Sequence, residues 1–281
     1  MKKIDISQFC VLSAPFLHHT LEYGLDAIAA NGFTHVELWG ASPHYCLDDY
    51  DAAGRKRRIQ EINAMLAARG LHMPVFYPEQ VRQYPINIAS PNRTIREKSL
   101  GIMRQYMQDA VAFGAGTMML APGWAFVDSF CEDDVKRAQE AVCLLAEEAK
   151  PLGLQLAMEE LDATSTLLVQ DMEALAGFVG TSGVGACMDV PLATTRGGSV
   201  GAYYSTFGSL AHVHLCGYGK DGYMPLGTGE LDVAAILAQL MEKGYTGKIS
   251  LSLWGAIYYP DPDAALRACR IWLENCALVA V

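Results

Sequence analysis

Three side chains of the kinds that bind divalent metal ions stand at the ends of three strand-like segments in this chain. Glu159 closes LQLAME, Asp189 lies in GACMDV, and His214 lies in AHVHLC. Carboxylate oxygens together with an imidazole nitrogen suit Mn²⁺, Mg²⁺, Co²⁺ or Zn²⁺. A metal ion held with open positions can polarise a carbonyl group, and a nearby carboxylate can then take a proton from the adjacent carbon. We therefore predict a divalent metal site of Glu159, Asp189 and His214, with Glu159 also as a catalytic residue.

Each of these residues also has a structural interpretation. Glu159 could cap a helix or form a salt bridge, and Glu160 would take its place if the strand register slipped by one residue. Asp189 could form a turn, and His214 could be a hydrogen-bonded core histidine. The metal interpretation is favoured because all three occupy matching positions on neighbouring strands. His212 lies two residues deeper and is expected to support the site rather than to bind the metal.

The segments that would position these residues alternate between two hydrophobic periods. Short apolar or β-branched runs are separated by longer stretches with apolar residues at helical spacing. Eight strand–helix units with short connections predict an α/β fold, a (β/α)8 TIM barrel, as a single domain over 1–281. A doubly wound sheet would need a glycine-rich phosphate turn after its first strand, and SAPFLHHTLEYG contains none. The predicted strands are 9–14, 34–40, 72–77, 116–121, 154–159, 185–190, 211–216 and 248–253.

Alternation within the strands separates a polar, inward face from an apolar, outward face. On KISLSL the inward residues are Ser250 and Ser252. In such barrels the polar residues near the carboxyl ends of the strands line the active-site mouth. Glu37 faces inward on the strand 34–40, and His44 and Glu79 lie on loops after strands; all three are expected to bind substrate or stabilise a loop at the mouth.

Two further features could complete the mouth. Lys220 lies in the glycine-rich segment CGYGKDGYMPLGTG, which could close over a substrate, and it is a candidate to bind an anionic group. Aromatic residues near the strand ends could form an apolar wall for the substrate or could simply pack at the rim. They are Trp39, Tyr77, Tyr84, Trp124 and Trp254.

Charge and composition narrow the class of partner. The chain has 281 residues and a net charge of −10, which disfavours binding along a nucleic-acid backbone. We find no signal peptide and no membrane-spanning run, and the eight cysteines form no CxxC pair, so no zinc-finger site is expected. Reduced cysteines used as small apolar residues fit a cytoplasmic protein with no membrane partner.

Several segments together resemble the xylose-isomerase-like TIM-barrel superfamily of sugar isomerases and epimerases. The resemblance is strongest to its fructoselysine 3-epimerase branch and weaker to the D-tagatose and D-psicose 3-epimerases. It spans almost the whole chain. The segments that carry it are GFTHVELWGASPHYC, FYPEQVRQYPINIASPNRTIREKSL, LQLAMEEL, ACMDV, HVHL, PLGTGELD and GYTGKISLSL.

The resemblance implies a metal site of four residues at the ends of strands five to eight: Glu, Asp, His and Glu. These positions fall on Glu159, Asp189, His214 and Ser252, so this chain has serine where the family has its second catalytic glutamate. A hydroxyl group is a far weaker acid and base than that carboxyl group. We expect Ser252 to contact the substrate, directly or by positioning a water.

The implied function is a divalent-metal-dependent sugar isomerase or epimerase of carbohydrate metabolism. It would act on a ketose or ketoamine of the fructoselysine type by proton abstraction through a metal-stabilised enediolate, and it could form a homodimer or homotetramer. Because of Ser252, two alternatives stay open: a lyase on a sugar-like substrate, and a non-catalytic sugar-binding protein. The superfamily also contains endonucleases, but these need a histidine-rich trinuclear site and a cationic face.

Overall fold

A closed barrel of parallel strands forms the centre of the computed structural model, which describes residues 2–80 and 86–278. The strand order is β11-β2-β3-β4-β5-β6-β7-β8, with β11 pairing to both β2 and β8, so the sheet has no free edge. All eight predicted strands are confirmed, and the fold is a TIM barrel. The strands are β2 (Phe9–Leu12), β3 (His35–Gly40), β4 (His72–Pro78), β5 (Thr117–Met119), β6 (Gln155–Met158), β7 (Gly185–Asp189), β8 (His212–Leu215) and β11 (Ile249–Leu251).

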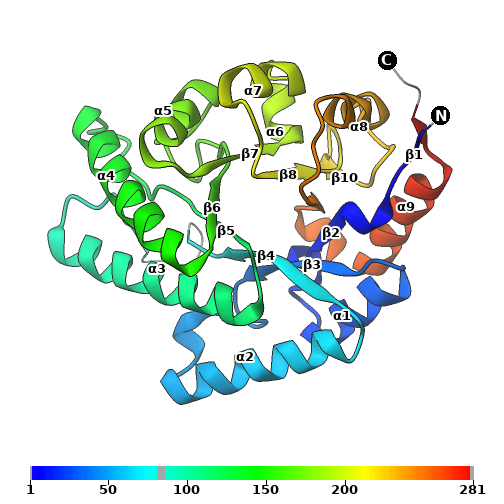
Figure 1. The fold of residues 1–281 in the computed structure, drawn as a ribbon, viewed down its shortest axis with the longest axis horizontal. Helices are drawn as coiled ribbons and strands as arrows, with labels where there is room; N and C mark the ends of the chain where they lie inside the picture. Colours follow the sequence, from blue (N-terminus) through cyan, green and yellow to red (C-terminus); the bar gives the residue numbers. More distant parts are fainter. Residues whose placement is uncertain (1, 81–85, 279–281) are drawn as a thin grey trace.

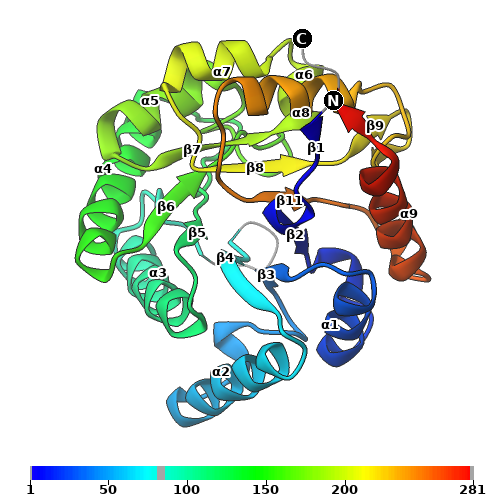
Figure 2. The ribbon, with the colours of Figure 1, turned by 45° about the vertical axis from the view of Figure 1, so that its right-hand side comes forward.

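Helices surround the strands as an outer ring (Figures 1 and 2). The helices are α1 (Leu21–Ala30), α2 (Ala52–Ala67), α3 (Arg93–Phe113), α4 (Glu132–Ala149), α5 (Met172–Ser182), α6 (Val190–Thr195), α7 (Val200–Phe207), α8 (Val233–Glu242) and α9 (Pro262–Asn275). The ends of α3 show why the pattern was readable. Asn92 accepts hydrogen bonds from the backbone N–H groups of residues 94 and 95, and Gly114 ends the helix with φ +84°, where glycine is favoured.

Short elements connect and close this ring. An antiparallel hairpin of β9 (Gly217–Gly219) and β10 (Gly222–Met224) follows β8 directly, within the glycine-rich segment. The terminal strands β1 (Lys2–Lys3) and β12 (Ala277–Leu278) pair with each other. Single 3-10 turns complete the chain: η1 (Ile6–Gln8), η2 (Ala14–Phe16), η3 (Leu47–Asp49), η4 (Lys150–Leu152) and η5 (Ala256–Tyr258). The hairpin matters for function because it brings side chains to the barrel mouth.

Two separate apolar clusters confirm the predicted alternation of strand faces. Outward residues such as Leu156, Met188 and Leu251 belong to a large cluster shared with the helices. The barrel interior has a smaller cluster that includes Val75 and Cys187. The polar residues assigned to the inward face are buried as well, so the sheet separates a helix-packed core from an interior that carries the ionisable groups.

The strand register shows which of the predicted site residues lie side by side on neighbouring strands. Asp189 pairs with His214 across β7 and β8, as expected for residues at matching positions. On β11, Ser250 pairs with His214, and Ser252 lies just beyond the carboxyl end of this strand. The register thus gives Asp189 and His214 matching positions on neighbouring strands. Because barrel strands are tilted and staggered, it leaves the equivalence of Ser252 a prediction.

Candidate metal centre and substrate pocket

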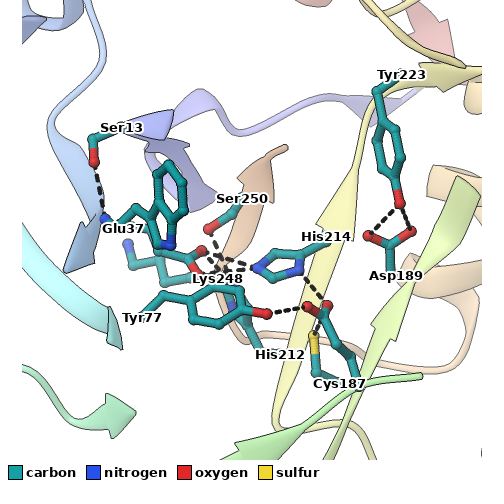
Figure 3. A network of polar contacts seen from close by, with 12 residues as sticks. Ser13, Glu37, Tyr77, Cys187, Asp189, His212, His214, Tyr223, Lys248 and Ser250 are labelled. Carbon is teal, nitrogen blue, oxygen red and sulfur yellow. Dashed lines mark hydrogen bonds and ion pairs between the residues drawn. The ribbon is translucent and has the colours of Figure 1, made fainter. Parts of the chain in front are cut away.

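His214 lies between two carboxylates in the barrel interior (Figure 3). Its Nδ1 is 2.5 Å from Glu159 Oε2, and its Nε2 is 3.0 and 3.2 Å from the two carboxylate oxygens of Glu37. The Tyr77 ring stacks on the imidazole with their centroids 5.9 Å apart. His214 and Glu37 are both fully buried. Each ring nitrogen of His214 thus faces a carboxylate: Nδ1 faces Glu159 near the barrel mouth, and Nε2 faces Glu37 in the barrel interior.

The two carboxylates favour the protonated, imidazolium form of His214. Burial disfavours the imidazolium, but the carboxylates of Glu159 and Glu37 outweigh it and raise the pKa of His214 well above its ordinary value. Burial likewise opposes ionisation of Glu37, yet the charges of His214 and His212 hold the pKa of Glu37 well below its ordinary value. His212 Nε2 lies 3.0 Å from Glu37 Oε2 and 3.0 Å from Ser250 Oγ. A positive charge is therefore stabilised between the two acids.

Glu159 lies immediately after β6 and has its two carboxylate oxygens in different surroundings. Tyr77 donates its hydroxyl to Oε1 at 2.8 Å. Oε2 faces His214 and also accepts a contact from the Cys187 thiol at 3.7 Å. The side chain is almost fully buried but lines the pocket at the mouth. Its orientation is thus set by three other side chains of the barrel interior.

Asp189 ends β7 and makes two hydrogen-bonding contacts. One carboxylate oxygen accepts a hydrogen bond from the backbone N–H of Leu192, which caps α6. Tyr223, from the hairpin strand β10, donates its hydroxyl toward the carboxylate at 3.3 Å from either oxygen. Burial, reinforced by the nearby charge of Glu159, raises the pKa of Asp189 to about 7. The residue therefore shares the electrostatic environment of Glu159 and His214.

The residues present fit a divalent metal ion. Among the described residues, two groups of three potential ligand atoms lie within 4.8 Å of one another: Glu37 with His212 and His214, and Glu159 with Cys187 and His214. In known metal sites a ligating histidine usually donates its second N–H to a carboxylate, as His214 could to Glu37. Glu159 and His214 would thus hold the ion, and Asp189 lines the same pocket. Asp189 belongs to neither group, so its predicted ligation stays a prediction.

A pocket opens above Glu159 at the carboxyl ends of the strands. Trp39 and Trp254 meet edge to face with centroids 5.2 Å apart, and Tyr77 meets Trp254 in the same way at 6.3 Å. An apolar wall thus stands beside polar groups, an arrangement typical of small-molecule sites. The lining residues are Trp39, Tyr77, Glu79, Gln80, Glu159, Glu160, Leu161, Asp162, Ser165, Asp189, Leu192, Tyr223 and Trp254. Trp124 does not line this pocket, and Tyr84 lies outside the described residues.

The structure brings some of the predicted substrate-binding residues to this pocket and leaves others away from it. Glu79 lines it. Glu37 lies inside the barrel against the two histidines, so its position favours orientation of His214 over contact with a substrate. His44 is buried elsewhere: its Nε2 lies 2.9 Å from the backbone oxygen of His19, and it lines a different hollow.

The other two predicted residues also lie apart from the pocket lining. Lys220 is exposed in the turn of the β9–β10 hairpin. Ser252 is fully buried, and its Oγ has no hydrogen-bond partner among the described residues. A buried hydroxyl group without a partner is unusual, because it loses its bonds to water without replacement. A polar neighbour of Ser252 is the Cys216 thiol, whose pKa is raised by burial and partly lowered by the Ser252 hydroxyl.

Sequence reasoning missed two residues of this site. Cys187 was treated as a small apolar residue, although its place on the inward face of β7 was readable from the alternation. Tyr223 lies in a glycine-rich segment without clear periodicity, and only the hairpin places its hydroxyl against Asp189. A further hydrogen bond from Tyr258 Oη to the Tyr223 backbone oxygen, 2.6 Å long, anchors that strand.

Curated proteins of two kinds are similar to this chain in sequence. The chain is 23% identical to fructoselysine 3-epimerase of Escherichia coli O157:H7 over 255 residues, which cover 88% of this chain and 90% of the relative. It is 26% identical to a probable endonuclease 4 of Mycobacterium leprae (strain Br4923) over 171 residues, 57% of this chain and 67% of the relative.

The fold is shared with solved sugar epimerases. A D-psicose 3-epimerase structure with D-tagatose, from Clostridium cellulolyticum H10, superposes with a TM-score of 0.73 at 19% identity. The superposition covers 95% of this chain and 99% of that chain. Residues 25–276 match the family model described as xylose isomerase-like TIM barrel. This match extends over most of the chain and confirms the resemblance inferred from the motifs. The chain belongs to the xylose isomerase-like TIM barrel family.

Proposed function

We propose that this protein is a divalent-metal-dependent sugar epimerase or isomerase that acts on a ketose or ketoamine. The observation that carries the proposal is the arrangement of Glu159, whose carboxylate lies in the pocket between the Tyr77 hydroxyl and His214. The similarity to fructoselysine 3-epimerase, over most of both chains, supports a sugar or sugar-amine substrate. When bound, the metal ion would polarise the substrate carbonyl group and stabilise the negative charge that develops on it.

Glu159 is the residue that we assign to proton abstraction. A general base must reach the carbon-bound proton, and Glu159 is the carboxylate whose two oxygens are held by side chains from three other strands. Tyr77, by donating to Oε1, fixes the orientation of that carboxylate. The aromatic wall of Trp39 and Trp254 would cover the non-reacting part of the substrate and exclude water from the reacting carbon.

An epimerase must return the proton from the opposite face of the substrate. Ser252 is a poor group for this role, because a hydroxyl group is a weak acid and its Oγ is not part of the pocket lining. Tyr223 lines the pocket and carries a hydroxyl group beside Asp189, so we assign the proton return to Tyr223 or to a water beside it. A lyase on a sugar-like substrate needs a single base only, and the serine at 252 keeps that second function open.

Deuterium exchange tests the proposal directly. The protein, loaded with Mn²⁺ or Zn²⁺, is incubated in D₂O with fructoselysine and with free ketohexoses, and incorporation is followed by NMR. We expect deuterium at the carbon beside the carbonyl group, and we expect Glu159→Gln to abolish it. Asp109→Asn serves as the matched control, since Asp109 is an equally buried carboxylate on α3 that bonds Tyr45 and lies outside the pocket.

The outcomes separate the candidate functions. Exchange with a new epimer or isomer supports the proposal, and exchange with loss of the sugar skeleton or of water supports the lyase. Binding of these sugars without any exchange would contradict the enzyme and favour a sugar-binding protein. Dimer or tetramer formation stays a separate prediction, which sedimentation would test.

A further inference from the structure

A thiol group occupies the interior side of the candidate metal centre. Cys187 lies on β7, two residues before Asp189, and is fully buried. Its Sγ is 3.7 Å from Glu159 Oε2. The Cys187 sulfur, a Glu159 oxygen and a His214 nitrogen all lie within 4.8 Å of one another. Three different donor atoms from β7, β8 and the end of β6 therefore converge on one point.

The surroundings of this thiol group differ from those of an ordinary core cysteine. The interior cluster around it is formed by residues such as Leu12, Val75 and Ala157, any of which would fill space without a polar atom. Cys187 instead directs its sulfur at a carboxylate that also faces an imidazole. By contrast Cys269, equally buried on α9, packs in the large cluster shared with the helices and belongs to neither group of potential ligand atoms found among the described residues.

The separation of the donors is close to that of two ligands on one ion. A thiolate about 2.3 Å and a carboxylate oxygen about 2.0 Å from a tetrahedral zinc ion lie about 3.5 Å apart. The observed distance from Cys187 Sγ to Glu159 Oε2 is 3.7 Å. The contact between Glu159 and His214, at 2.5 Å, is shorter than two such ligands would show, so these two side chains would move apart to admit an ion.

We propose that Cys187 is a metal ligand of this site, which would make the centre a mixed oxygen, nitrogen and sulfur site selective for Zn²⁺ or Co²⁺ over Mg²⁺ and Mn²⁺. The inference rests on the metal dependence proposed above and deepens it. Soft thiolate donors favour zinc, whereas magnesium and manganese prefer oxygen ligands. Coordination would release the Cys187 thiol proton to solvent. The resulting thiolate would supply, from β7, the negative charge that the hydroxyl group of Ser252 does not supply at the end of β11.

Cobalt substitution tests the assignment with a readout that does not depend on activity. Apoprotein prepared with chelator is titrated with Co²⁺, and the near-ultraviolet absorption is recorded. We expect a sulfur-to-cobalt charge-transfer band that saturates at one ion per chain, and we expect Cys187→Ser to remove it. We expect Zn²⁺ affinity to fall at least tenfold in Cys187→Ser and to stay unchanged in Cys269→Ser, the matched control on α9. Circular dichroism confirms that each variant is folded.

A second measurement keeps the inference testable if Cys187→Ser does not fold. Cadmium NMR of the wild-type protein reports a bound thiolate through a strong downfield shift, without any variant. The inference is overturned if Co²⁺ binds without a charge-transfer band, if the band survives in Cys187→Ser, or if no metal binds. Deuterium exchange into a sugar without a charge-transfer band would contradict only the assignment of Cys187 as a ligand. A charge-transfer band without deuterium exchange into any sugar would instead contradict the proposed reaction and leave the ligand assignment intact.

Discussion

Replacement of Glu37 by glutamine tests how much the buried Glu37 carboxylate stabilises and orients His214. In the wild type, one Glu37 carboxylate accepts from His214 Nε2 at 3.0 Å and from His212 Nε2 at 3.0 Å. Glutamine keeps one acceptor oxygen but presents an NH₂ group where the other oxygen stood. One histidine N–H then faces a donor, and the imidazolium loses one of its two counter-charges.

The expected loss of folding free energy depends on how deeply this cluster is buried. Glu37, His212 and His214 are all buried, so little water can replace the lost bond. A hydrogen bond to a charged group contributes roughly 1.5–3 kcal/mol, and removal of one partner of a buried pair costs about 3–5 kcal/mol. We expect Glu37→Gln to lose about 2–4 kcal/mol of stability, a value between these bounds because one acceptor remains. A weaker partner for a ligating histidine lowers metal affinity about 10- to 100-fold, which corresponds to roughly 1.4–2.7 kcal/mol.

Isothermal titration calorimetry with Zn²⁺ and Mn²⁺, together with urea unfolding of the apoprotein, measures both effects. Asp109→Asn is the control, because Asp109 is also buried and bonds Tyr45 and Arg55, but lies on α3. It should lose stability and keep its metal affinity. A folded Glu37→Gln protein that binds both metals as tightly as the wild type would refute the view that Glu37 orients His214.

Three further predictions concern the same cluster. Tyr77→Phe removes the 2.8 Å bond to Glu159, so we expect kcat for sugar exchange to fall about 10- to 100-fold while the fold is kept, as a rate assay with circular dichroism would show. Ser252→Glu buries one more acid, so we expect a lower melting temperature that added Zn²⁺ restores, measured by calorimetry. Because the pKa of Glu37 is lowered on folding, its contribution is complete above about pH 4.5 and is lost as pH falls. Urea unfolding between about pH 5 and pH 3 should therefore show a steeper loss of stability in the wild type than in Glu37→Gln.

Two predictions from the sequence concern membrane spans and nucleic-acid binding. Within residues 2–80 and 86–278, the structure contains no helix that is both long and apolar enough to span a bilayer. The net charge of −10 still argues against binding along a nucleic-acid backbone, although one relative is a probable endonuclease. Metal and sugar binding assays address the function more directly than either feature.

Local patterning of the sequence was enough to predict the barrel. The eight strands were readable because alternation has a period of two, helices have a period near 3.6, and residues such as Gly114 mark where a helix must end. The same alternation placed Glu159, Asp189 and His214 on inward-facing positions near strand ends. The apolar face of each strand packs against the helices and leaves the other face for the barrel interior, so this assignment needed no knowledge of the neighbouring strands.

Only the tertiary structure decided which of these side chains meet. Glu37 is separated from His214 by 177 residues, and closure of the barrel brings their side chains within 3.0 Å. Likewise the hairpin, not any periodic pattern, carries Tyr223 to Asp189. Periodicity determines which face of a strand a residue occupies. The stagger between strands and the course of the loops determine its partners, and these depend on how the whole sheet closes.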